Sequence, residues 1–223
     1  MDGLIEKYDL FIFDLDDTLV KTEKYHYEAW LKTLKEIVGK DFYIDYHFFC
    51  SKFHSMIENS IKIYLENDLK ISEKEYDNIY NLKITNYLKI IEDNKKTIVL
   101  IPELDIFLNK IIASSKKFVI VTNTSKCNLD FYLDLFPILQ QSSKTYYREM
   151  LIHKKPNPEC YLKVEQDFPN LRKVAFEDSI TGIHALSLIP SISIIFINSS
   201  DYYYYDYIIE TYSLENIIVN YKF

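Results

Sequence analysis

Two aspartates, two positions apart, follow the first apolar run of the sequence. Residues 8–13 read YDLFIF, and Asp14 and Asp16 come directly after them. In an extended chain residues i and i+2 point to the same side, so the two carboxylates are expected to be close. One then suits a nucleophile or metal ligand, and the other a proton donor and acceptor. A solvated acidic turn that caps the next element is the alternative explanation of this short pattern.

Two further clusters offer groups that can bind phosphate. Thr122 and Asn123 end an apolar run and supply a hydroxyl and an amide, which can donate to phosphate oxygens. Lys155 precedes a proline, which restricts its backbone, and its ammonium is a point charge suited to a phosphate. Lys154 is a competing candidate for that role. Helix capping by the threonine and solvation of both lysines are the structural alternatives.

A fourth cluster is acidic and lies near the start of a predicted helix. Glu177 and Asp178 follow the apolar run of KVAF. Hard cations such as Mg²⁺ prefer oxygen ligands, although carboxylates also stabilise helix N-termini. Taken together the four clusters are complementary, with acids for a metal and a nucleophile and with hydrogen-bond donors for a transferred phosphoryl group. Phosphoryl transfer needs mainly positioning and charge neutralisation.

The elements that must position these clusters alternate along the chain. Residues 22–96 show apolar side chains at helical spacing, and no strand is predicted there. After them, predicted strands at 117–123, 173–178 and 192–198 alternate with helices, which indicates a parallel α/β sheet. We therefore expect an α/β domain made of residues 1–19 and 97–223, with a helical insertion at 20–96. Since ligands of parallel sheets bind beyond the carboxyl ends of the strands, the four clusters should meet there.

Composition excludes several other classes of protein. The 223-residue chain is 48% apolar, which suffices for a substantial core, and its net charge of −7 gives no electrostatic footprint for nucleic acid. No apolar stretch is long enough to span a membrane, and no signal peptide is recognised. Three scattered cysteines suggest neither a disulfide framework nor a zinc cluster, so a reducing cytoplasm is expected.

The four clusters, read in order, resemble the motifs of the haloacid dehalogenase superfamily. The matching segments are DLDDTL, VIVTN, KKPNP and FEDSITGI. In addition, TEKYHYEAW at 22–30 resembles the entrance to the helical cap of the β-phosphoglucomutase-like subfamily. The resemblance implies a Rossmann-like parallel sheet core with an inserted α-helical cap.

The resemblance also implies roles for individual residues. Asp14 would be the nucleophile that forms an aspartyl-phosphate, and Asp16 the proton donor and acceptor. Thr122 would bind the phosphoryl oxygens and Lys155 would neutralise their charge. The cofactor would be Mg²⁺, bound by Asp14, by the backbone carbonyl of Asp16 and by Asp178.

The remaining assignments are a further metal ligand and three substrate contacts. Glu177 would be the further ligand, and Asn123 would lie beside the substrate. His26 falls where mutase-like members have a histidine near the cap hinge, although a position on the outer helix face explains it equally well. Neither arginine of the chain falls in the cap, where mutase-like members hold a second phosphate, and Lys52 is the nearest substitute.

These observations predict an Mg²⁺-dependent phosphatase acting on a small phosphorylated metabolite, with a sugar phosphate as the expected substrate class. A sugar-phosphate mutase with the same chemistry is the alternative, and a catalytically silent binding protein on the same fold is the second. The carboxylate at Asp16 argues against dehalogenase and phosphonate hydrolase activity, because those relatives lack it. The sequence leaves open whether the protein is a monomer or a dimer.

Overall fold

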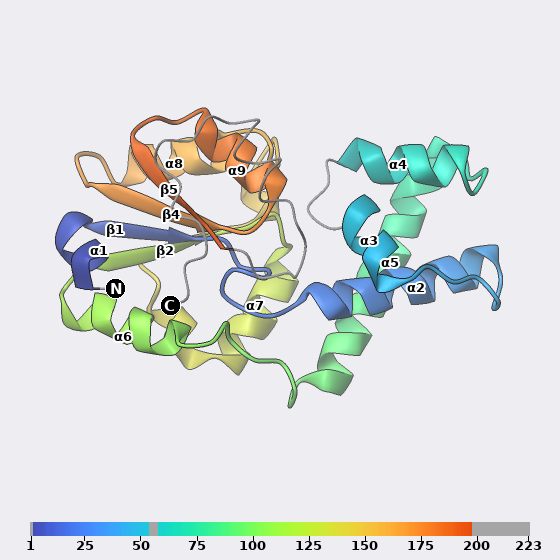
Figure 1. The fold of residues 1–223 in the computed structure, drawn as a ribbon, viewed down its shortest axis with the longest axis horizontal. Coiled ribbons are helices and arrows are strands. Elements are labelled where there is room, and N and C mark those ends of the chain that lie inside the picture. Colours follow the sequence, from blue (N-terminus) through green and yellow to red (C-terminus); the bar gives the residue numbers. More distant parts are fainter. Residues whose placement is uncertain (1, 54–57, 198–223) are drawn as a thin grey trace. The chain divides into compact units, whose positions relative to one another are not determined.

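The computed structural model describes residues 2–53 and 58–197, and the side chains of residues 51–52 and 58–60 lie outside this description. The chain divides into two compact units (Figure 1). One unit runs to Lys21 and resumes at Val99, and the other spans Thr22–Ile98. None of the described helices is long and apolar enough to cross a membrane.

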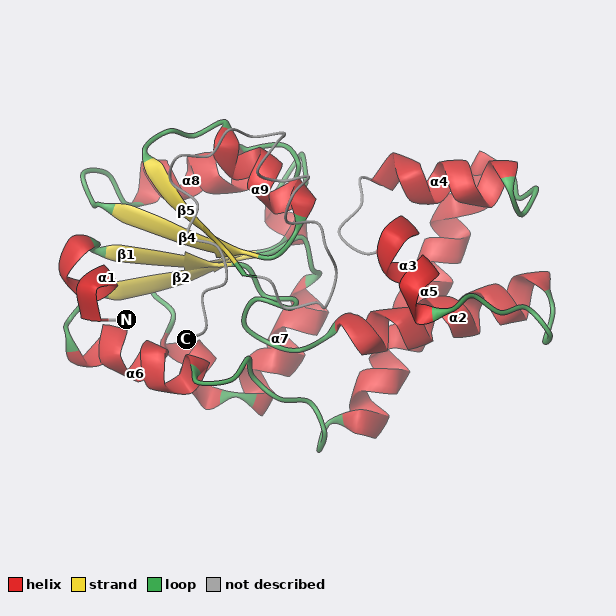
Figure 2. Cartoon of the chain, in the orientation of Figure 1, coloured by secondary structure: helices red, strands yellow, loops and turns green. Residues whose placement is uncertain are grey.

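The described residues of the first unit form a five-stranded sheet in the order β3-β2-β1-β4-β5. All four strand pairs are parallel, which confirms the predicted α/β architecture. Figure 2 shows the strands gathered in this unit. The strands are β1 Leu10–Phe13, β2 Lys117–Val121, β3 Lys144–Tyr146, β4 Lys173–Glu177 and β5 Ile192–Phe196.

Helices cover both faces of the sheet, which is why its strands are apolar on both sides. Leu10 and Ile12 of β1 pack with α8 (Glu159–Asp167) and α9 (Ile180–Ser187). Phe11 and Phe13 point to the opposite face, where they contact Phe107 of α6 (Leu104–Ala113) with ring centroids 5.7 and 6.3 Å apart. Helix α7, Lys126–Leu135, follows β2. The sheet is thus the middle layer of three.

The register of the central strands brings their carboxyl ends to one level. Phe13 at the end of β1 is paired with Ile120 of β2 and Phe176 of β4. Asp14 is tied to β4 as well, because its backbone N–H donates to the carbonyl of Phe176 over 3.1 Å. The residues that follow these three strands therefore share one edge of the sheet.

The regular elements in the described residues of the second unit are all helices. The longest pair, α2 and α5, is joined by a buried hydrogen bond of 3.0 Å from Asn86 Nδ2 to Thr33 Oγ1. Ser72 and Glu75 form a capping box before α5. The helices are α2 Glu23–Val38, α3 Tyr46–Lys52, α4 Glu58–Asn67, the 3₁₀ turn Glu73–Glu75 and α5 Tyr76–Asn94.

Some elements differ from those predicted. A short helix, α1 Asp2–Lys7, precedes β1, and Tyr8 continues its hydrogen bonding to Leu4, so the strand begins at Leu10. The edge strand β3 is only three residues long, which is too short for a periodic pattern. Strand β5 ends at Phe196, and the predicted strand's last position, 198, lies outside the described residues.

Candidate active site

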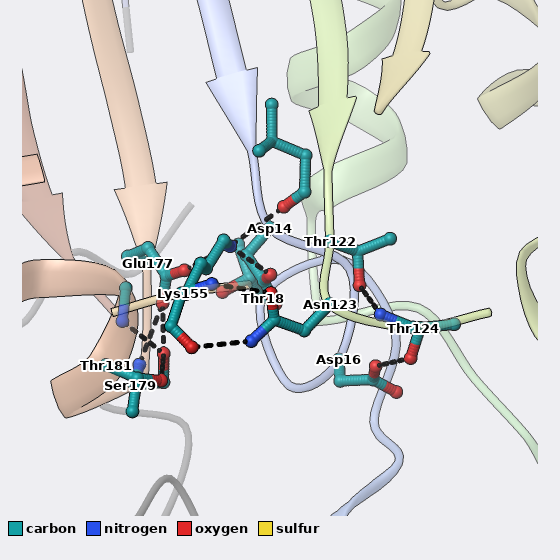
Figure 3. A network of polar contacts seen from close by, with 12 residues as sticks. Asp14, Asp16, Thr18, Thr122, Asn123, Thr124, Lys155, Glu177, Ser179 and Thr181 are labelled. Atoms are coloured by element: carbon teal, nitrogen blue, oxygen red, sulfur yellow. Dashed lines mark hydrogen bonds and ion pairs between the residues drawn. The ribbon is translucent and has the colours of Figure 1, made fainter. Parts of the chain in front are cut away.

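A buried lysine joins two strand-end carboxylates. Lys155 Nζ donates to Asp14 Oδ1 over 2.6 Å, to Glu177 Oε1 over 2.5 Å and to the carbonyl of Val121 over 2.9 Å (Figure 3). The three acceptors belong to the ends of β1, β4 and β2. All three ammonium protons are therefore used, and the lysine is fixed between the strands.

The charges in this cluster act strongly on one another because they are buried. Burial lowers the pKa of Lys155, but the charges of Asp14 and Glu177 outweigh it and hold that pKa well above its usual range. Burial also raises the pKa of Asp14, and the nearby Glu177 and Asp178 add to this, while Lys155 opposes it. Since acids outnumber cations at this point, an added positive charge would stabilise the ionised cluster.

Glu177 is bound on both of its oxygens. Besides Lys155, Oε1 accepts from the buried hydroxyl of Tyr161 over 3.1 Å. Oε2 accepts from the backbone N–H and the hydroxyl of Ser179 over 2.9 and 2.8 Å. The carboxylate lies where a Cβ atom on Gly182 would be, so any larger residue at this position would displace it. The motif glycine is explained by this close approach.

Three carboxylates converge at the same edge. Ligand oxygens of Asp14, Glu177 and Asp178 all lie within 4.8 Å of one another. The hydroxyl of Thr18, itself buried, donates to Asp178 Oδ1 over 3.0 Å and so orients this carboxylate. Burial and the charge of Glu177 raise the pKa of Asp178. A donor set made only of oxygens suits a hard divalent cation.

The loop after β2 supplies a hydroxyl and a tie to the lysine loop. Asn123 bonds to the main chain of Lys155 in both directions, accepting its N–H over 2.9 Å and donating to its carbonyl over 3.1 Å. Thr122 Oγ1, which is buried, accepts from the N–H of Thr124 over 3.0 Å. Across the described parts of the chain, the Thr122 hydroxyl proton meets no acceptor. It therefore remains able to donate to a ligand oxygen.

Comparison with known proteins agrees with this geometry. The profile of the haloacid dehalogenase-like hydrolases matches residues 8–188, which include every strand-end cluster. The chain belongs to this hydrolase family. The predicted superfamily is thereby confirmed, and the hydrolase is identified as an enzyme.

Three proteins similar to the hydrolase have low sequence identity to it. Protein CbbY of Rhodobacter capsulatus is 25% identical over 194 residues, which cover 77% of this chain and 78% of CbbY. A candidate β-phosphoglucomutase of Thermotoga maritima has a TM-score of 0.69 at 19% identity, covering 95% and 94% of the two chains. CbbY of Rhodobacter sphaeroides in complex with xylulose-1,5-bisphosphate has a TM-score of 0.70 at 18% identity, covering 85% and 86%. The two solved structures share the fold of the hydrolase.

The hydrolase brings together most of the residues that the sequence singled out. The residues predicted at strand ends lie at one edge of the sheet: Asp14, Asp16, Thr122, Asn123, Lys155, Glu177 and Asp178. His26 belongs to the helical unit, where its ring stacks on Tyr87 and its Nδ1 lies 2.8 Å from Lys83 Nζ. The side chain of Lys52 lies outside the described residues. The chemical roles of all these residues stay predictions.

The sequence analysis did not identify several other residues that form hydrogen bonds in the candidate site of the hydrolase. Thr18 lies inside the first motif, so its place beside the acids was a usable signal. Thr124 and Ser179 read as ordinary helix-start residues, and Tyr161 reads as a core position of its helix. In the helical unit, the burial of Lys83 on α5 was also not predicted, because a lysine among charges at helical spacing is usually solvated.

Proposed function

We propose that this hydrolase removes the phosphoryl group from a small phosphorylated metabolite through an aspartyl-phosphate on Asp14. The observation that carries the proposal is the buried Lys155–Asp14 ion pair at the carboxyl edge of the sheet. Lys155 holds Oδ1 of Asp14, whereas Oδ2 accepts no hydrogen bond from the described residues. A carboxylate that is oriented on one oxygen and open on the other suits a nucleophile.

The first half-reaction would transfer the phosphoryl group to Asp14. An oxygen of Asp14 bonds to phosphorus while the bond from phosphorus to the ester oxygen breaks. Asp16 gives its proton to that ester oxygen, which leaves as an alcohol. Thr122 donates to the phosphoryl oxygens, on which negative charge accumulates, and the positive charge of Lys155 neutralises part of that charge.

The second half-reaction would regenerate the enzyme. A water molecule gives a proton to Asp16, now a carboxylate, as its oxygen bonds to phosphorus. The bond between phosphorus and Asp14 breaks, so inorganic phosphate is released and Asp14 becomes a carboxylate again. One residue thus serves as acid and then as base, as microscopic reversibility requires.

The acidic cluster fits the Mg²⁺ that the family resemblance implies. The carboxylates of Asp14 and Asp178 and the backbone carbonyl of Asp16 would hold it, because all are hard oxygen donors. Glu177 would contribute mainly as the counter-charge of Lys155, because both its oxygens already accept hydrogen bonds. When bound, Mg²⁺ supplies positive charge that lowers the repulsion between the nucleophile and the phosphoryl group.

A sugar phosphate is the substrate class we propose. The CbbY relative from Rhodobacter sphaeroides was solved with xylulose-1,5-bisphosphate, which supports a phosphorylated sugar here. The helical insertion predicted at 20–96 would form the cap and exclude bulk water during the transfer.

A mutase is the second candidate, and one observation in the helical unit favours it. Lys83, which is buried, bonds to His26, so this unit carries a paired cationic side chain although it lacks arginine. A mutase needs such a charge to hold a second phosphate. A lysine binds phosphate as a point charge and without the bidentate geometry of arginine.

Phosphorus NMR of the purified protein with Mg²⁺ and a panel of sugar phosphates tests the proposal. The panel includes β-glucose 1-phosphate primed with a trace of the bisphosphate. We expect inorganic phosphate to accumulate, and EDTA to abolish it. Accumulation of glucose 6-phosphate without inorganic phosphate would indicate the mutase instead, and an unchanged spectrum throughout would favour a silent binding protein.

Asp14→Asn is the variant that tests the nucleophile. Turnover should fall at least about a thousandfold, since an amide cannot form the acyl phosphate. Asp130→Asn is the matched control, because Asp130 lies on α7 in a surface pair with Lys126. Unchanged turnover in Asp14→Asn would overturn the mechanism.

A further inference from the structure

Thr124 connects the loop after β2 to the aspartate proposed as acid and base. Its hydroxyl donates to Asp16 Oδ2 over 2.7 Å, and its own N–H donates to Thr122 Oγ1 over 3.0 Å (Figure 3). Thr124 is only 8% exposed. The phosphate-binding hydroxyl and the acid are therefore linked through one residue.

The position of the Thr124 hydroxyl is set by its own backbone. Its carbonyl accepts from the N–H of Arg148 over 3.0 Å, and the Arg148 guanidinium Nε donates to the carbonyl of Asn123 over 3.0 Å. The peptide groups on both sides of Thr124 are thus held by Arg148. A β-branched side chain also has few χ1 rotamers, so a fixed backbone leaves the hydroxyl little freedom.

We propose that Thr124 is a positioning residue that aims the Asp16 carboxyl at the leaving oxygen, an inference that rests on the proposed function. By binding Oδ2, the hydroxyl restricts rotation of the carboxyl group and directs Oδ1 to the proton exchange. A general acid acts only within hydrogen-bond reach of the oxygen it protonates, so a freely rotating carboxyl loses part of its effect.

The step in which this positioning acts is departure of the alcohol. When the bond from phosphorus to the ester oxygen breaks, that oxygen takes the proton of Asp16, which becomes a carboxylate. A sugar alkoxide is a poor leaving group and depends on this proton. A 2,4-dinitrophenolate is stable as an anion and leaves without it. Loss of the Thr124 hydrogen bond should therefore slow sugar esters more than the dinitrophenyl ester.

The experiment measures kcat/KM for a sugar phosphate and for 2,4-dinitrophenyl phosphate. This parameter is chosen because kcat/KM includes only the steps up to the departure of the first product, which here is the alcohol. Thr124→Val removes the hydroxyl and retains the shape. We expect a fall of about tenfold on the sugar phosphate and of no more than about twofold on 2,4-dinitrophenyl phosphate. Thr124→Ser restores the hydroxyl and should recover the sugar ester rate to within about threefold of the native enzyme.

Two further variants keep the test decisive. Thr124→Ala replaces the valine variant if that protein does not fold, and the same difference between the two esters is expected. Thr33→Val is the matched control, because it removes a buried hydroxyl with a hydrogen bond in the helical unit. It should lower the melting temperature and leave the ratio of the two rates unchanged.

The outcomes separate this role from the proposed function. Equal losses on both esters, or no loss on either, with an active native enzyme would overturn only the role of Thr124. A native enzyme that hydrolyses neither ester would overturn the proposed function and this role with it. Failure of Thr124→Ser to recover the rate would also contradict the role of the hydroxyl.

Discussion

The carboxyl edge of the sheet and the helical unit each contain a buried lysine, and the two lysines make different contacts. At the edge, Lys155 donates three hydrogen bonds, and its acid partners come from positions 141 and 22 residues away in the sequence. In the helical unit, Lys83 contacts His26 and lies over the ring of Tyr87, within a pair of packed helices. The first arrangement is a network of matched donors and acceptors, and the second combines a hydrogen bond with contacts to an aromatic ring.

This difference indicates where substitution is tolerated. In the network around Lys155 each ammonium proton has a defined acceptor, so removing one residue leaves another buried group without its hydrogen bond. Packing between helices accepts other side chains of similar volume at lower cost. We infer that the sheet edge carries the chemistry and that the helical unit is free to vary with the substrate.

The largest expected effect comes from removing the central cation. Lys155→Met leaves Asp14 and Glu177 buried without their counter-charge, so turnover should be lost. Unfolding free energy should fall by about 3 kcal/mol or more in EDTA. Urea unfolding measures this. Lys126→Met, on the surface, is the control and should unfold like the native protein. A Lys155→Met protein of native stability would show that Asp14 and Glu177 do not need the charge of Lys155.

The second effect comes from filling the space that the Glu177 carboxylate occupies. Gly182→Ala introduces a Cβ atom that overlaps this carboxylate, so the destabilisation should be roughly 1–3 kcal/mol and activity should drop. Thermal melts measure the loss of stability, and phosphate release measures the loss of activity. Gly3→Ala is the control, because nothing lies within 4 Å of its added Cβ. If both variants behave alike, the close approach is not required.

A smaller and more selective effect is expected in the helical unit. Lys83→Met keeps the apolar stem and removes the charge. KM for a sugar bisphosphate should rise about tenfold, because a charged hydrogen bond is lost. The rate on 2,4-dinitrophenyl phosphate should stay within about twofold of native. Lys89→Met, exposed on α5, is the control. Equal losses on both substrates would mean that Lys83 has a structural role.

The smallest effect concerns thiol reactivity. Burial raises the pKa of Cys160 to about 11, whereas Cys127 is exposed and Cys50 is buried. Because the thiolate is the reactive form, iodoacetamide at pH 8 should modify Cys127 and spare the other two in the native protein. Peptide mass spectrometry identifies which cysteines are modified. Rapid labelling of Cys160 would show that the packing under the site opens readily.

Much of the fold could be predicted because its elements have strong local patterns. The continuous apolar runs of β1, β2 and β4 and the helical spacing of 22–96 are properties of neighbouring residues. The short strand β3 and helix α1 were missed because so few residues carry no periodic signal. Strand β3 forms because β2 offers it hydrogen bonds at the sheet edge.

The candidate site, like the fold, contains residues that the sequence predicts and residues that it does not. The acids, the threonine and the lysine at the strand ends were identified from residue type and order, since a parallel sheet must bring such ends together. Their partners were not. Tyr161 on Glu177 and Thr124 on Asp16 are contacts between segments 16 and 108 residues apart, which no local pattern specifies.

The amino-acid sequence therefore specifies which groups are available for chemistry and the type of element that carries each. It does so because side-chain chemistry and helix or strand periodicity are local. Packing in three dimensions specifies which oxygen each donor meets and which carboxylate is left open to a ligand. That information arises only when β1, β2 and β4 align, since a hydrogen bond needs its donor and acceptor, here from segments far apart in the chain, to lie about 2.7–3.2 Å apart.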